Sequence, residues 1–257
     1  MPKFFAPEAA PGARFLVLTG ENAAHAKVLR LKPGERVTIC DAKGTDFQCT
    51  VSDVAPGQIS LVVQCEEPSR AEPGVFCSVY MAFAKSEKLE HVIQKATELG
   101  AGEIVAFPSS RCVAKPDDKS LMKKLERWQK IAASAAEQSG RGRIPQVRAL
   151  GSFREAVLEA SGCDLALFPY ENEKTLSLRD CLNTGGYRNV SIMTGPEGGF
   201  SEEEVALAAE NNMKICSLGP RILRCETAPL CALAAVLYAS GALDRSADEK
   251  DGSHGKE

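Results

Sequence analysis

The chain has 257 residues, enough for one large or two modest domains, and its hydrophobic content of 44% and charged content of 25% are those of a globular protein. A net charge of −3 excludes a uniformly basic coat for nucleic acid, and no apolar run approaches the roughly 20 residues of a membrane span. The N-terminus has no secretion signal and the ten cysteines have no zinc spacing, so we expect a cytoplasmic protein without a bound metal, whose cysteines are mostly reduced and buried.

Residues 1–72 have the pattern of a small β-rich unit. Four short β-prone runs are separated by Pro/Gly turns, which predicts a compact barrel; the runs are residues 15–18, 36–40, 47–51 and 59–63. Residues 22–31, between the first two strands, have helical spacing. We expect His25 in this helix to cap or pack, and two interpretations stand for Arg30: a phosphate contact or a surface ion pair.

Residues 66–74 are polar and interrupted by two prolines, so we place a domain boundary there, with the second domain over residues 73–241. That domain begins with an apolar strand over residues 75–84, a helix that ends at Gly100, and a strand over residues 104–107. This βαβ unit predicts a parallel sheet. Lys95 and Glu98 are three residues apart in the helix and are expected to form an ion pair.

A basic stretch follows, because residues 111–148 contain ten Lys or Arg and only four acids. Its first part, residues 118–139, is a long amphipathic helix with a basic outer face. Its second part is a glycine-spaced loop that holds Arg141 and Arg143, both free to reach phosphate unless one of them locks the loop through a salt bridge. The stretch is therefore a candidate phosphate-binding surface.

Two glycine-containing loops dominate the last quarter of the chain. The first, Thr-Gly-Pro-Glu-Gly-Gly over residues 194–199, links a strand to a helix that Ser201 and Glu204 open as a capping box. The second, over residues 218–228, links a short strand to an apolar helix over residues 229–240. Loops at the carboxyl ends of parallel strands converge, so the two predict one ligand pocket. Residues 242–257 contain few apolar side chains and are expected to be a disordered tail.

The pair Gly-Pro-Glu-Gly-Gly and Leu-Gly-Pro-Arg-Ile-Leu-Arg-x-Glu-Thr-Ala resembles the SPOUT-class methyltransferases, and most closely the bacterial family that methylates N3 of a uridine in 16S ribosomal RNA. Residues 25–31 and 138–145 resemble the same family, and the likeness covers residues 15–240. It implies an α/β fold: an N-terminal PUA-like β-barrel and a C-terminal SPOUT domain with a trefoil knot. It also implies S-adenosylmethionine as cofactor, a homodimer, and 16S ribosomal RNA or the 30S subunit as partner.

The resemblance and the chemistry of the cofactor together give a candidate pocket. Adenine needs backbone donors and acceptors and the sulfonium needs an apolar wall. The expected cofactor-binding residues are Leu167, Phe168, Pro169, Thr194, Gly195, Pro196, Glu197, Gly198, Leu218, Gly219, Ile222, Leu223 and Thr227. Two positions depart from the family pattern: Cys225, where Ser or Thr is more usual, and Thr194, where an aliphatic residue is.

Methylation of uridine N3 requires loss of the imide proton and stabilisation of the charge that spreads to O2 and O4. Arginines suit the second task, by the logic of an oxyanion hole, and the candidates are Arg111, Arg221 and Arg224. The base is Glu197, Glu226 or solvent. Each glutamate also has a structural interpretation: Glu197 accepts loop amide hydrogens, and Glu226 pairs with Arg224. The candidate RNA-binding residues are Arg30, Lys85, Arg111, Arg141 and Arg143.

Two other functions compete with this one. A SPOUT ribose 2′-O-methyltransferase has the same kind of cofactor pocket, although the arginine loop and the N-terminal barrel favour the base methyltransferase. A non-catalytic RNA-binding assembly factor of the ribosome keeps the fold without the cofactor, and the intact glycine loops count against it.

Overall fold

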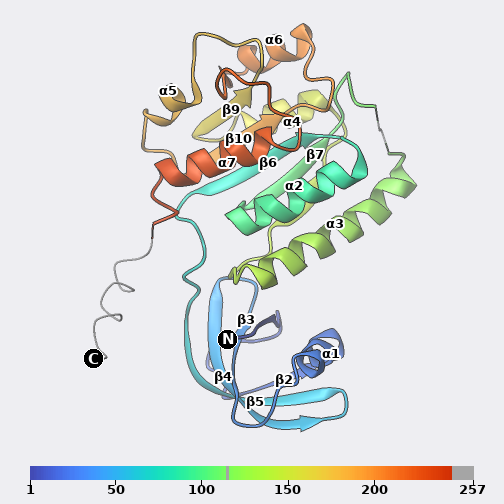
Figure 1. Ribbon diagram of the computed structural model, residues 1–257, viewed down its shortest axis with the longest axis vertical. Helices are drawn as coiled ribbons and strands as arrows, with labels where there is room; N and C mark the ends of the chain where they lie inside the picture. The colour runs from blue at the N-terminus through green and yellow to red at the C-terminus, as the bar shows by residue number, and fades with distance from the viewer. Residues whose placement is uncertain (114–115, 245–257) are drawn as a thin grey trace. The chain divides into compact units, whose positions relative to one another are not determined.

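The computed structural model describes residues 1–113 and 116–244, which divide into two compact units (Figure 1). The first unit contains residues 1–72 and 132–145, and the second contains residues 73–131 and the described chain from residue 146 on. The loop that holds Arg141 and Arg143 therefore belongs to the N-terminal unit. The predicted single boundary at residue 72 does not include residues 132–145, with which the chain comes back to the first unit.

The first unit is a five-stranded sheet with the strand order β1-β3-β4-β5-β2, in which β1 is parallel to β3 and the other neighbours are antiparallel. Its elements are β1 (Lys3–Phe5), β2 (Phe15–Thr19), α1 (Gly20–Val28), β3 (Arg36–Cys40), β4 (Thr45–Ala55) and β5 (Gln58–Pro68). Phe4, Phe47 and Leu61 are fully or almost fully buried in its core. The four predicted strands are all present. Strand β1 was not predicted, because its three residues are too few to show a periodic pattern.

His25 lies on α1, where its ring packs edge-on against Phe4 at a centroid distance of 5.3 Å. Its Nδ1 is 3.1 Å from Glu137 Oε1, within the same unit. The predicted packing role of His25 is confirmed.

The second unit is built on a six-stranded, wholly parallel sheet with the order β11-β9-β10-β6-β7-β8. Its strands are β6 (Phe76–Ala82), β7 (Glu103–Phe107), β8 (Gln146–Ala149), β9 (Leu165–Pro169), β10 (Asn189–Thr194) and β11 (Lys214–Cys216). The helices after β6 are α2 (Ser86–Leu99), α3 (Asp118–Gln138), α4 (Phe153–Ala160), α5 (Leu178–Leu182), α6 (Glu202–Glu210) and α7 (Ala228–Ala239), and the part of α3 from residue 132 on belongs to the first unit. The predicted parallel sheet is thus confirmed, with β8 as an edge strand that the sequence pattern did not reveal.

Helices cover both faces of this sheet. Helices α2 and α7 pack together on one face, as Figure 1 shows, while α4 and α6 enclose a core with Tyr80, Phe107 and Phe168 on the other. Parallel strands buried on both faces have continuous apolar sequences, as β9 does with five buried residues. Gly100 ends α2 in the left-handed conformation with φ +115°, as predicted.

Several expectations from the sequence can be compared with this structure. Lys95 and Glu98 form the predicted ion pair at 2.7 Å. All ten cysteines are free thiols, but only half of them are buried, fewer than expected. Within residues 1–113 and 116–244, no helix is long and apolar enough to cross a membrane, and no group of three or more His, Cys, Asp or Glu side chains could hold a metal ion. Most of the predicted tail, residues 245–257, lies outside the described residues.

Candidate active site

The topology of the parallel sheet brings three loops to one edge. Strand β9 pairs with both β10 and β11, in parallel, so the carboxyl ends of the three strands are neighbours. The chain leaves them at Pro169, Thr194 and Cys216. Loops that follow adjacent parallel strands define the usual ligand site of an open α/β sheet.

The loop after β10 is compact because its glycines allow close backbone contacts. Gly199 has φ +66° and donates its N–H to Pro196 O at 3.0 Å, which closes a turn. A Cβ on Gly195 would lie 3.2 Å from the carbonyl carbon of Gly199. The predicted capping box of Ser201 and Glu204 is present in both directions and fixes the start of α6.

The loop after β11 is also shaped by a left-handed glycine. Gly219 has φ +107° and donates its N–H to Ser217 Oγ at 3.1 Å. At the other end of the loop, Arg224 O accepts hydrogen bonds from the N–H groups of Thr227 and Ala228, at 2.8 and 3.0 Å. These contacts form the turn from which α7 begins.

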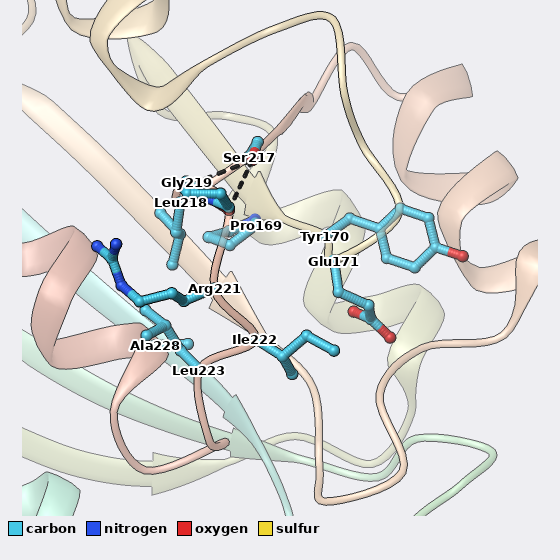
Figure 2. Close-up of a pocket in the computed structure, with 11 residues that line it drawn as sticks. Pro169, Tyr170, Glu171, Ser217, Leu218, Gly219, Arg221, Ile222, Leu223 and Ala228 are labelled. Atoms are coloured by element: carbon cyan, nitrogen blue, oxygen red, sulfur yellow. Dashed lines mark hydrogen bonds between the residues drawn. The ribbon is translucent and has the colours of Figure 1, made fainter.

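Between these loops lies an open pocket, lined by residues of all three, with about 870 Å³ of empty space when the adjoining open solvent is included. A smaller space, about 480 Å³ with open solvent included, adjoins it and shares Pro169, Glu171, Ile222, Leu223 and Ala228 with it. Figure 2 shows Glu171 and Ile222 facing this smaller space, with the guanidinium of Arg221 extending away from Glu171. Ile222 is 87% exposed, which is unusual for an apolar side chain and suits a wall that a ligand covers.

The larger and the smaller space together are lined by ten of the thirteen predicted cofactor-binding residues. The ten are Pro169, Thr194, Gly195, Pro196, Glu197, Gly198, Leu218, Gly219, Ile222 and Leu223. Leu167 and Phe168 do not line it, because both are fully buried inside β9, and only Pro169 at the end of that strand reaches the pocket. Thr227 precedes α7 and is also absent from the lining.

A cluster of charges joins the two glycine loops behind the pocket. Lys88 Nζ lies 3.5 Å from Glu197 Oε1 and 3.4 Å from Glu226 Oε2, one carboxylate from each loop. Glu197 also accepts the N–H of Lys85 at 3.1 Å, and the Cys225 thiol donates to Glu226 at 3.2 Å. Glu226 therefore pairs with Lys88, and the alternative in which it pairs with Arg224 is wrong.

The cluster keeps both carboxyl groups ionised. Burial by itself raises the pKa of Glu197, but hydrogen bonds from backbone N–H groups, together with Lys88, bring it below its ordinary 4.5. Burial also raises the pKa of Glu226, but a backbone hydrogen bond, the hydrogen bond from Cys225 and the interaction with Lys88 bring it below its ordinary 4.5. Burial lowers the pKa of Lys88, but its electrostatic interactions with Cys225, Glu226 and Glu197, together with the hydrogen bond to Glu226, raise it above 10.5.

The three candidate catalytic arginines lie near the pocket with exposed side chains. Arg221 and Arg224 belong to the loop after β11 and line the smaller and the larger space respectively. Arg111 lies beyond β7, and its Nη1 donates to Gly198 O at 3.0 Å. Glu204 holds this region in place, because it accepts from Ser109 Oγ and from the Ser110 N–H at 3.2 and 2.7 Å.

The predicted RNA-binding residues separate into exposed and buried side chains. Arg30, Lys85, Arg111 and Arg143 are exposed. Arg141 is only 3% exposed and forms two hydrogen bonds with Glu72, from Nη2 at 2.7 Å and Nε at 3.2 Å. The prediction that Arg141 binds RNA is therefore wrong, since a buried, bidentate ion pair leaves it unable to reach phosphate. It has the loop-locking role that was the alternative.

The sequence interpretation missed Lys88 and Glu171 as site residues. Lys88 is in the first turn of α2, just beyond the end of β6, so its place at the same sheet edge was a usable signal. Glu171 lies two residues beyond β9 and lines both spaces of the pocket. Its position could have identified it, because a carboxylate that closely follows a buried parallel strand lies at the edge of the sheet where ligands bind.

Two family models and several known proteins match this chain. A family model described as an RNA methyltransferase domain matches residues 72–237, and one described as an RNA methyltransferase PUA domain matches residues 18–64. The chain is 38% identical to ribosomal RNA small subunit methyltransferase E of Bacillus subtilis, over 86% of this chain and 89% of the relative.

Two solved structures are similar over nearly the whole chain. Ribosomal RNA small subunit methyltransferase E from Neisseria gonorrhoeae, bound to S-adenosyl methionine, has a TM-score of 0.83 and 32% identity, covering 93% of this chain and 97% of that one. A putative methyltransferase from Legionella pneumophila, in complex with the cofactor SAM, has a TM-score of 0.82 and 30% identity, covering 92% and 97%.

Proposed function

The chain belongs to the ribosomal RNA small subunit methyltransferase E family, and we propose that it transfers the methyl group of S-adenosylmethionine to N3 of a uridine in 16S ribosomal RNA. The observation that carries the proposal is the pocket between the two glycine loops, at the adjacent carboxyl ends of β9, β10 and β11. The acceptor atom and the RNA rest on the resemblance of these loops to the uridine-N3 methyltransferases.

The residues of the pocket fit the cofactor. Gly195, Gly198 and Gly199 line the pocket with backbone, and their lack of a Cβ lets the loop pack closely against itself, Arg111 and Glu171, while the exposed Ile222 offers an apolar surface. Glu171 supplies a carboxylate for a ligand that has both a sulfonium and an ammonium group. Bound S-adenosylmethionine would supply an electrophilic methyl group on its sulfonium.

The protein's own residues then act on the acceptor base. In the transfer, the sulfur–carbon bond breaks, a bond from N3 to the methyl carbon forms, and the N3 proton leaves. In this proposal Arg111, Arg221 and Arg224 stabilise the negative charge on O2 and O4, which is supported by the lining positions of Arg221 and Arg224 and by the contact of Arg111 with Gly198. Arg111 uses one N–H on Gly198 and keeps its other donors for this task.

The lowered pKa values of Glu197 and Glu226 make both carboxylates weak bases at neutral pH, since a general base works best with a pKa near the working pH. We infer that the proton passes to solvent and that Glu197 shapes the loop. Of the three bases that the sequence allows, which are Glu197, Glu226 and solvent, the proposal therefore takes solvent.

Exposed basic residues in both units would hold the RNA. Arg30 and Arg143 belong to the first unit, and Lys85 and Arg111 to the second. We place the reaction in the cytoplasm, on 16S RNA or the 30S subunit. We also propose that the second unit contains the trefoil knot, and that the protein forms the homodimer, that the resemblance implies. Light scattering tests the dimer, because it measures the mass of the protein in solution.

The experiment is methyl transfer from labelled S-adenosylmethionine to 30S subunits, or to free 16S RNA, from cells that lack this modification. We expect labelled 3-methyluridine after digestion to nucleosides, with the yields on the two substrates showing which form is recognised. Label on a ribose 2′-oxygen would instead identify a ribose methyltransferase. Tight RNA binding without transfer would leave a non-catalytic assembly factor.

A further inference from the structure

Lys88 occupies an unusual position for a residue that does not line the pocket. It lies in the first turn of α2, and its Nζ is between a carboxylate of the loop after β10 and a carboxylate of the loop after β11. The side chains of Lys88, Glu197 and Glu226 are 22 to 23% exposed, so water screens their charges only in part. Strand β9 separates β10 from β11 in the sheet, so Lys88 connects two loops whose strands are not direct neighbours.

The two carboxylates need a cation between them. Both interacting oxygens lie within 3.5 Å of Nζ, so they are at most about 7 Å from each other. Two like charges this close, and partly buried, repel unless a positive charge offsets them. Of the charged partners of Glu197 and Glu226 in the described chain, Lys88 is the one that contacts both.

The other contacts of the cluster fix its geometry. The Lys85 N–H attaches Glu197 to the start of α2, and the Cys225 thiol, 3.8 Å from Lys88 Nζ, donates to Glu226. Helix α2 packs against α7, which the second loop enters, so its first turn is a firm base for the lysine. The cluster therefore joins each loop to a helix of the scaffold.

We propose that Lys88 is a positioning residue that holds the two glycine loops at the separation at which the pocket accepts the cofactor. The inference rests on the proposed function, because it assumes that these loops bind S-adenosylmethionine. Lys88 acts through Glu197 and Glu226. Without it, the loops separate for most of the time, and the apparent affinity falls in proportion to the fraction of molecules that remain competent, so that a tenth competent leaves a tenth of the affinity.

The experiment measures binding of S-adenosylmethionine and S-adenosylhomocysteine to the full-length protein by calorimetry. Lys88→Met should weaken both by about 10-fold, as expected if about a tenth of the molecules keep the loops together. Lys88→Arg keeps the charge and should recover most of the affinity. The matched control is Lys95→Met, which removes an ion-paired lysine of the same helix, and it should bind within about 2-fold of the wild type.

Kinetics separates positioning from general loss of structure. Lys88→Met should raise the KM for S-adenosylmethionine about 10-fold and leave kcat at saturation within about 2-fold. Glu226→Gln added to Lys88→Met removes the uncompensated charge and should restore part of the affinity, a coupling that simple misfolding would not give.

Wild-type affinity and KM in Lys88→Met would overturn the inference, as would equal losses in Lys88→Met and Lys88→Arg. If the wild-type protein itself bound no S-adenosylmethionine, the proposed function would fail instead, so the two failures are distinct.

Discussion

Replacing Arg141 by methionine should destabilise the N-terminal unit without removing an RNA contact. Glu72 accepts two hydrogen bonds from the Arg141 guanidinium and two more from the N–H groups of Gly142 and Arg143, at 2.9 and 3.1 Å. Removing one partner of a buried ion pair costs about 3 to 5 kcal/mol. Glu72 is 19% exposed and keeps its two backbone donors, so we expect the lower end, about 3 kcal/mol.

Arg143 provides the matched control, because it is two residues away in the same loop and is exposed. Arg143→Met should change the free energy of unfolding by less than about 0.5 kcal/mol and weaken RNA binding, with a smaller dependence on salt. Denaturant unfolding followed by circular dichroism gives the stabilities, and filter binding at several salt concentrations gives the affinities. An Arg141→Met protein of wild-type stability with weakened RNA binding would refute the assignment of these two arginines.

Two further predictions concern the pocket. Gly199→Ala places a methyl group 2.6 Å from Glu171 Oε1 at φ +66° and should weaken S-adenosylmethionine binding about 10-fold, whereas Gly186→Ala, with φ +75° and open space around it, should cost about 1 kcal/mol of stability and leave binding unchanged. The pKa values of Glu197 and Glu226 are below 4.5 and that of Lys88 is above 10.5, so the cluster weakens only as the pH falls below about 4.5 or rises above about 10.5. Affinity for S-adenosylmethionine should accordingly be constant between about pH 5 and pH 7, and a midpoint near pH 6 would contradict this account of the cluster.

Local features of the site could be predicted from the sequence because neighbouring residues determine them. Ser201 and Glu204 form their capping box within one turn of helix, and Gly100 ends α2 through its own backbone conformation. The sequence also predicted that the two glycine loops meet at one edge of the sheet. Each loop directly follows a β-prone run, and the carboxyl ends of parallel strands lie at the same edge.

Contacts between distant parts of the chain could not be predicted in this way. The position of Lys88 just beyond β6 indicates the sheet edge at which it lies, but not that its partners are Glu197 and Glu226, far along the chain. Arg141 and Arg143 are two residues apart in an irregular loop, where no periodicity tells which side chain is buried against Glu72. Leu167 and Phe168 were assigned to the pocket although they lie within a strand that is buried on both faces.

The position of the cofactor pocket is tested most directly by hydrogen exchange of the full-length protein, measured with and without S-adenosylhomocysteine. We predict increased protection in the loops over residues 170–171, 195–200 and 217–227, and in the first turn of α2, because these segments enclose the pocket or attach its loops. The sheet of the first unit should be unchanged. Protection confined to that sheet, with the three loops unaffected, would contradict the placement of the cofactor between the two glycine loops.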